Sequence, residues 1–465
     1  MKESQIQLAK LPKPTIFQNV APVFLSDETM NERKQKVLDN MKSEGYDALV
    51  IYADKEHGGN FEYLTGFIPR FEEGLLVLDD TGQCTLILGN ENLKMAQVAR
   101  IENQLIHCPL FSLPNQPMDN EARLETIFET IGLSEKSQIG VVGWKMFTTA
   151  KSANEAYFDL PYFIIQALLT SKNEQAVVKN AAHLFIRGDK GARTTNNVNE
   201  IAHYEYGANL ASSCILNAMD AVAIGVTEAT LGNELTAEGQ TNTVVTIAAT
   251  GKRFEYGNVY PTHKKVAMGD PLSLTTAFKG GLSSRTGFVI ENVEQLPENQ
   301  QDYLERVAKP YYQAVTTWLE TIKIGMPGRE LYQTIETIFP KADYHWHLNP
   351  GHLVSDEEWM SSPIYAGSEE RLKSGMILQI DIIPSVAGYT GVSAEECVAL
   401  ADNQLQKQIR EEYPELWERI ITRKKYIKEI VKIDLSEEVI PLSNTVGYLR
   451  PFYLAKDQAF QCVNC

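Results

Sequence analysis

Residues 375–381 read GMILQID, a short apolar run that ends on an acidic side chain. The run continues to residue 384 within MILQIDIIP, a pattern typical of a buried strand. Two further short stretches lie on either side of it, GHLV at 351–354 and GVSAEE at 391–396. Each stretch carries a side chain that can do acid–base chemistry or bind a metal: His352, Asp381 and Glu395.

The remainder of the C-terminal half mixes strands with helices. Apolar residues at three- and four-residue intervals, or a charged helical pattern, predict helices over 197–223, 299–322, 328–338 and about 403–432. Short apolar segments predict strands over 242–249, 271–277, 376–384 and 396–401. Grouped strands interrupted by helices favour an α+β domain.

The N-terminal half has a different pattern. Short apolar runs bounded by turn residues predict strands over 47–53, 74–79 and 84–89, and helical patterns cover 30–44 and 91–100. Alternation of helix and strand favours an α/β domain. Ser171 precedes a helical pattern at 173–186, so we expect domains at 1–171 and 172–465.

Composition excludes several classes of protein. The chain has 465 residues, 43% of them hydrophobic, and a formal net charge of -17. Such a chain can bury two cores, but its charge disfavours binding to nucleic acid or to anionic membranes. The first residues lack the apolar segment of a secretory signal, and no apolar stretch is long enough to span a bilayer, so we expect a cytoplasmic protein.

Six scattered cysteines are most simply reduced thiols in that compartment. Cys462 and Cys465 have the spacing of a redox or metal pair, but no second pair accompanies them. A frayed chain end is the favoured interpretation.

The three short stretches resemble motifs of the creatinase, prolidase and aminopeptidase P family. GHLV resembles Gly-His-Leu-Leu-Gly, GMILQID resembles Gly-Met-x-x-x-Ile-Glu, and GVSAEE resembles Gly-Val-Arg-Ile-Glu-Asp. YLTGF at 63–67 is similar to the family's N-terminal segment. The resemblance covers about residues 30–402. It implies a pita-bread C-terminal domain behind a creatinase-like α/β domain, and a homodimer.

The peptidases of this family hold two metal ions with two aspartates, one histidine and two glutamates. The resemblance places His352 on the histidine, Asp381 on one glutamate and Glu395 on the other. Both aspartates are missing: the first falls on Ser273 or Thr275, and the second falls on Ser284. Neutral hydroxyls are poor ligands for divalent cations, so we expect no dinuclear centre and no cofactor. A single divalent ion on His352, Asp381 and Glu395 is the alternative.

Creatinase breaks a guanidinium-type C–N bond without metal. Its Leu-Ser-Leu-Asn-Thr segment resembles LSLTT at 272–276. However, the histidine that creatinase uses as acid and base falls on Asn258, and a nearby glutamate falls on Thr286. One further family histidine falls on Trp359. Neither chemistry of the family therefore transfers unchanged.

The loop GKRFEYGN at 251–258 replaces the family's usual small-residue loop beside the site. Glu255 could be a base, and Lys252 or Arg253 could bind a substrate carboxylate. The alternative is that residues 251–258 are a solvated loop whose charged side chains form surface ion pairs and have no part in a site. His263 could replace the missing histidine, and Asn258 is the remaining polar candidate of this loop.

Two arginines are further candidates. Arg285 follows the lost aspartate position and could offset the remaining acids, so we count it among the substrate-binding residues. Arg70 lies where creatinase-like N-terminal domains send an arginine into the neighbouring subunit's site. His345 and His347 would share one face of a strand, and packing beside Trp346 is the favoured interpretation for them.

Three functional hypotheses remain from this sequence. The first is a creatinase-like hydrolase or lyase that breaks a C–N bond of a small amino-acid-like or amidine-like substrate without the dinuclear centre, with His352, Asp381, Glu395 and Glu255 as catalytic residues. The second is an Xaa-Pro peptidase with a mononuclear site. The third is an inactive pita-bread protein that binds a peptide or small ligand.

Overall fold

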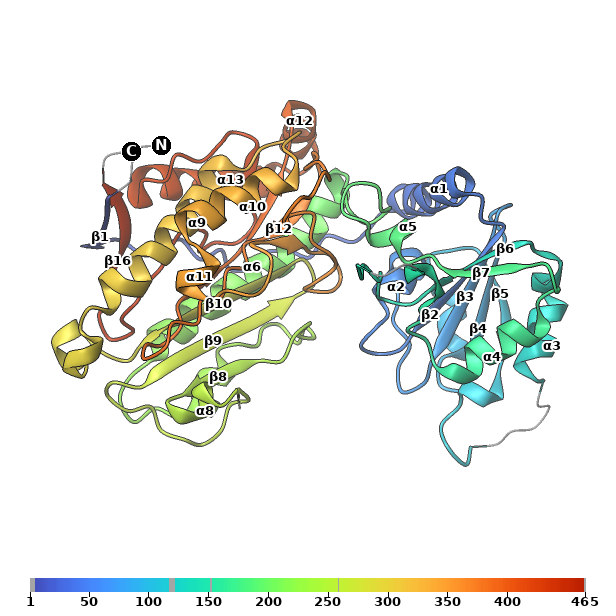
Figure 1. The fold of residues 1–465 in the computed structure, drawn as a ribbon, viewed down its shortest axis with the longest axis horizontal. Coiled ribbons are helices and arrows are strands. Elements are labelled where there is room, and N and C mark those ends of the chain that lie inside the picture. Colours follow the sequence, from blue (N-terminus) through green and yellow to red (C-terminus); the bar gives the residue numbers. More distant parts are fainter. Residues whose placement is uncertain (1–4, 117–121, 151–152, 258, 464–465) are drawn as a thin grey trace. The chain divides into compact units, whose positions relative to one another are not determined.

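The computed structural model describes residues 5–116, 122–150, 153–257 and 259–463. The chain divides into two units, one of residues 25–194 and the other of residues 1–24 and 195–465. We call them the N-terminal unit and the C-terminal unit (Figure 1). No helix among the described residues combines the length and apolarity that crossing a bilayer requires.

The N-terminal unit is a mixed six-stranded sheet with helices packed on it, as an alternation of strand and helix predicts (Figure 1). The strand order is β5-β4-β3-β2-β6-β7, with β6 parallel to both β2 and β7. The three strands predicted from apolar runs are confirmed as β2, β3 and β4. The main elements are α1 (Asp27–Glu44), β2 (Ala48–Ala53), α2 (Gly59–Thr65), β3 (Gly74–Asp79), β4 (Cys84–Leu88), β5 (Gln104–His107), α3 (Leu124–Thr130), β6 (Gln138–Val142), α4 (Tyr162–Ser171), β7 (Val177–Asn180) and α5 (His183–Ile186).

The boundary between the units lies between Thr194 and Thr195, later than the expected boundary after residue 171. The helix expected over 173–186 is instead the strand β7 followed by the short helix α5. β7 joins the sheet through β6, and this long-range pairing overrides the local helical pattern. The helix expected over 91–100 is only a 3-10 turn, η1 (Leu93–Gln97).

The C-terminal unit contains two four-stranded sheets and helices that cover them (Figure 1). One sheet has the order β13-β10-β9-β8, and the other has the order β11-β12-β14-β15. Their strands are β8 (Ile247–Thr250), β9 (Pro271–Phe278), β10 (Gly281–Phe288), β11 (His352–Leu353), β12 (Ile377–Gln379), β13 (Ser393–Glu395), β14 (Cys397–Leu400) and β15 (Val439–Pro441).

A separate two-stranded ribbon pairs β1 (Gln5–Lys10) with β16 (Gln458–Val463). The first residues of the chain therefore belong to the C-terminal unit rather than to the expected domain 1–171.

The long helix α6 (Val198–Ala221) packs against β9 and β10 (Figure 1). It begins where predicted, because Asn197 and Glu200 form a reciprocal capping box at its start. The helix approaches the β9–β10 turn very closely at Gly207, where an added Cβ would lie 1.8 Å from the carbonyl oxygen of Lys279. Only glycine allows this approach, so Gly207 fixes how α6 lies on the sheet.

The remaining helices differ in detail from the predicted ones. The predicted charged helix is broken at Pro414 into α12 (Asn403–Glu412) and α13 (Pro414–Lys425), since proline cannot continue the first helix. The other helices are α7 (Glu228–Asn233), α8 (Lys252–Glu255), α9 (Lys309–Thr321), α10 (Gly328–Ile338) and α11 (Lys341–Tyr344).

Candidate active site

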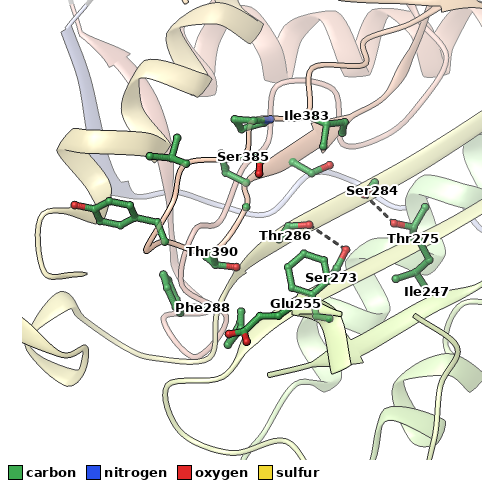
Figure 2. A pocket seen from close by; sticks show the side chains of 18 of the residues that line it. Ile247, Glu255, Ser273, Thr275, Ser284, Thr286, Phe288, Ile383, Ser385 and Thr390 are labelled. Carbon is green, nitrogen blue, oxygen red and sulfur yellow. Dashed lines mark hydrogen bonds between the residues drawn. The ribbon is translucent and has the colours of Figure 1, made fainter. Parts of the chain in front are cut away.

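A cavity of about 900 Å³ lies in the C-terminal unit, along the face of β8, β9 and β10 (Figure 2). Its other walls are formed by α8 and by residues 383–393, which lead into β13. Glu255 and Glu395 are the two acidic side chains that line it. Among the described residues around this space, none is Lys, Arg or His.

Four hydroxyls form the sheet wall of the cavity. Ser273 and Thr275 on β9 lie opposite Thr286 and Ser284 on β10, and alternate residues of a strand share one face. The Thr275 and Ser284 hydroxyl oxygens are 2.8 Å apart, and Thr286 donates to Ser273 at 3.0 Å (Figure 2). These are the positions where the family resemblance leads us to expect aspartates and a glutamate. Here they form two neutral, internally hydrogen-bonded pairs.

Glu395 lies at the end of this wall. It pairs with Ser284 across β10 and β13, it is only 8% exposed, and Ser393 donates a hydrogen bond to it at 3.1 Å. Burial raises the pKa of Glu395 well above its usual value, and the acids Asp381 and Glu358 raise it further. A raised pKa favours the protonated form of a carboxyl group, and such a group can give its proton to a reacting group.

Asp381 follows β12 and is 4% exposed. Burial raises the pKa of Asp381 to about 6, opposed by His352 and reinforced by Glu358. The His352 Nε2 atom lies 3.8 Å from the Asp381 carboxylate, so two of the predicted site residues are neighbours.

His352 on β11 is fully buried and pairs with a residue that the motifs did not indicate. Its Nε2 atom lies 3.2 Å from a carboxylate oxygen of Glu358, but this contact lacks hydrogen-bond geometry, and Nε2 has no hydrogen-bond partner among the described residues. Burial lowers the pKa of His352, but Glu358 and Asp381 outweigh this effect and raise it overall.

Glu358 was not predicted as a site residue, because it lies in a loop between Leu353 and Ser361, which pair as an isolated bridge. The loop folds back on β11 and brings residue 358 beside residue 352. Its neighbour Trp359 lies with its ring centroid 5.4 Å from that of His352. The sequence signal was the acid-rich run DEEW at 356–359, directly after GHLV.

Arg285 does not face the cavity, contrary to the expectation that it binds substrate. It lies on the opposite face of β10, is fully buried, and pairs with Glu396 at 2.5 Å. Its other donors reach the carbonyl oxygens of Ser284, Thr445 and Tyr448 at 2.7, 2.9 and 3.0 Å. Since side chains alternate across a strand, the neighbour of Ser284 must point away from it. Arg285 instead holds β10 to the C-terminal segment.

Arg253 on α8 has a structural partner as well. Its Nε atom lies 3.0 Å from the buried carboxylate of Glu228, which also accepts from the backbone amides of Thr250 and Thr262. Glu228 thereby holds both ends of the loop that carries Glu255. Sequence reasoning did not identify Glu228, since it lies on a different helix, α7.

The remaining candidates are dispersed. Lys252 and His263 are exposed and do not line the cavity, and Asn258 lies outside the described residues. Arg70 is exposed in the N-terminal unit. His345 and His347 are also exposed, and they do not lie on a strand: α11 ends at Tyr344, while Trp346 is buried between them. Cys462 is buried, and Cys465 lies outside the described residues.

The resemblance implies a metal, and the residues present do not fit one well. Within the described parts of the chain, no group of three or more His, Cys, Asp or Glu side chains has an arrangement that could hold an ion. The hydroxyls at the aspartate positions hydrogen-bond to each other. His352 Nε2 lies beside the carboxylates of Glu358 and Asp381, at 3.2 and 3.8 Å.

Residues 202–402 match the model of metallopeptidase family M24. No curated protein matches the chain by sequence.

Solved structures with the same fold include an Xaa-Pro dipeptidase from Bacillus anthracis, with 16% identity and a TM-score of 0.61 over 81% of this chain and 96% of that chain. A prolidase from Thermococcus sibiricus has 18% identity and a TM-score of 0.63 over 80% and 95%. A prolidase from Pyrococcus furiosus has 20% identity and a TM-score of 0.56 over 79% and 97%. These identities are low, so the structural likeness concerns the fold alone, and the match to the family model concerns residues 202–402 alone. The C-terminal unit therefore carries the sequence pattern of metallopeptidase family M24 over those residues, and the chain has a pita-bread C-terminal domain that follows an α/β N-terminal domain.

Proposed function

We propose that the C-terminal unit is a hydrolase that breaks a C–N bond of a small amino-acid-like or amidine-like molecule without a dinuclear metal centre. The observation that carries this proposal is the position of Glu395. Its carboxyl group, whose pKa is raised by burial, lines a cavity whose wall has hydroxyls where the metallopeptidases of the resemblance have aspartates.

Hydrolysis of a C–N bond needs a proton for the leaving nitrogen and a base for the attacking water. Glu395 supplies the proton, because burial raises its pKa and so favours its protonated form. Glu255 lines the same cavity and is the candidate base. The water oxygen bonds to carbon, its proton passes to Glu255, and the C–N electron pair leaves with nitrogen, which takes the proton of Glu395.

His352, Asp381 and Glu358 support this step from behind the cavity wall. Asp381 and Glu358 both raise the pKa of Glu395, so they keep its proton in place until the substrate binds. His352 partly offsets their charge. We therefore assign these three as positioning residues, and Glu395 as the residue that touches the substrate.

The second candidate is an Xaa-Pro peptidase with one metal ion on His352, Asp381 and Glu395. It is favoured by the names of the similar structures, which include an Xaa-Pro dipeptidase and prolidases. Metal analysis of the purified protein separates the two candidates. If the protein holds a stoichiometric transition metal and its removal by a chelator abolishes turnover, the peptidase hypothesis is supported and the metal-independent hydrolase is ruled out.

The direct test is turnover of a panel of guanidino, N-acylated and proline-containing compounds. We expect release of amine or urea from a guanidino or N-acyl compound, and loss of at least about a hundredfold in rate for Glu395→Gln. Glu294→Gln removes the same charge from an exposed 3-10 turn, η5 (Val293–Gln295), outside the cavity, and should leave the rate unchanged. Absence of turnover across the panel would favour an inactive, ligand-binding protein. The homodimer and the cytoplasmic location remain predictions.

A further inference from the structure

The charge of the cavity restricts what can bind there. Two carboxyl groups line it, Glu255 and Glu395, and no basic side chain among the described residues does. Three basic residues belong to the segments around α8: Arg253 pairs with Glu228, Lys264 pairs with Asp270 at 2.8 Å, and Lys252 is exposed and does not line the cavity. A ligand carboxylate would therefore lose its hydration without gaining a positive partner, which is costly.

The cavity also presents an unused hydrogen-bonding group. Thr390 is 6% exposed and lines the cavity, yet its hydroxyl has no hydrogen-bond partner among the described residues. Figure 2 shows Thr390, Thr286 and Glu255 around the same space. A buried polar atom without a partner is uncommon in a folded protein, and a ligand donor would satisfy it.

The rest of the lining suits an organic cation. Phe254 and Phe288 line the cavity, and aromatic faces attract cations. At the rim, Tyr389 donates a hydrogen bond to Asp302 at 2.7 Å, which places another carboxylate near the opening. Apolar side chains such as Ile247 and Ile383 also line the cavity.

We propose that this cavity binds an organic cation, an amidinium or guanidinium group on a small apolar body that carries no carboxylate. The cation lies against Glu255, and one of its N–H groups donates to the Thr390 hydroxyl. This inference names the substrate class and in that sense rests on the proposed function. It separates the chain from a peptidase for free dipeptides, because every such dipeptide ends in a carboxylate.

Binding measured by calorimetry tests the proposal without any turnover. Three probes of similar length are compared: butylguanidine, the neutral butylurea, and the zwitterion 4-guanidinobutyrate. Butylguanidine should bind about tenfold more tightly than butylurea, because only it carries the charge that Glu255 attracts. It should also bind more tightly than 4-guanidinobutyrate, and its affinity should fall as salt is raised.

Two variants assign the contacts. Glu255→Gln should weaken butylguanidine about fivefold, as expected for one solvent-exposed charge pair, and should leave butylurea nearly unchanged. Thr390→Val should weaken both probes. Glu294→Gln makes the same change in net charge outside the cavity and should have no effect on either probe.

The outcomes separate this inference from the proposed hydrolase. If 4-guanidinobutyrate binds as tightly as butylguanidine, or if Glu255→Gln changes nothing, the cation site is wrong even where C–N bonds are broken. If butylguanidine binds as expected but no compound is turned over, the cation site stands and the hydrolase fails.

Discussion

The buried pair of Arg285 and Glu396 offers a quantitative test of how the site is held together. The two side chains are 1% and 0% exposed and lie 2.5 Å apart. Glu396 also accepts from Ser283 at 2.9 Å and from the Thr445 hydroxyl. Arg285→Met would leave the Glu396 carboxylate buried with only these two neutral donors.

We expect Arg285→Met to lower the free energy of unfolding of the C-terminal unit by about 4 kcal/mol, since removal of one partner of a buried pair leaves the other charge uncompensated. Glu396→Gln should cost about 3 kcal/mol, because the guanidinium keeps its four carbonyl acceptors. The double variant should cost much less than the sum of the two, because no isolated charge remains.

Urea unfolding followed by tryptophan fluorescence is a suitable assay. Of the five tryptophans, only Trp144 belongs to the N-terminal unit, so the signal reports mainly on the C-terminal unit. Arg329→Met is the matched control: its partner Glu369 is 77% exposed, and the loss should stay below about 1 kcal/mol. A loss below about 1 kcal/mol for Arg285→Met, or additive effects in the double variant, would refute the reasoning.

Two further predictions concern single residues. Burial raises the pKa of Asp381 to about 6, so the folded state binds the proton of this group more tightly than the unfolded state does. The contribution of this proton to the free energy of unfolding is fully present below about pH 4 and is lost as the pH rises through 6. Asp381→Asn should therefore gain up to about 3 kcal/mol relative to the natural protein between pH 4 and pH 7 in urea unfolding, and an unchanged pH dependence would contradict the raised pKa. Gly207→Ala should lower the free energy of unfolding by about 1–3 kcal/mol, because its Cβ would collide with the Lys279 carbonyl oxygen. Asn217→Ala, at an exposed position of the same helix, is the control and should change it by less than about 0.5 kcal/mol.

Elements with a strong local pattern were predictable from the sequence. The helix α6 has a capping box and a long apolar repeat, and β2, β3 and β4 are compact apolar runs, so local chemistry and tertiary packing agree there. By contrast, β10 was not anticipated as a strand. Its sequence GLSSRTGF contains mostly small and polar residues, and its pairing with β9 and β13 determines its conformation.

The site was predictable where a motif carries it and not where the tertiary fold does. The proximity of His352 to Asp381 agrees with the motifs, and Glu395 lines the cavity. Glu358 and Glu228 could not be placed, since each reaches its partners only after the chain has folded back. The role of Arg285 depends on which face of β10 its side chain points to. Because this segment was not predicted to be a strand, there was no basis in the sequence for assigning that face.

The pairing of β1 with β16 has a consequence for synthesis on the ribosome. Residues 25–194 are continuous in sequence, so the N-terminal unit can fold as soon as it has emerged. The strand β1 is made before it, but its partner, residues 458–463, is made only after the N-terminal unit and most of the described C-terminal unit. Until residues 458–463 have emerged, β1 is therefore an unpaired strand that other chains could capture. Refolding of the finished chain has no such delay, and the two routes should differ in how much of the protein aggregates.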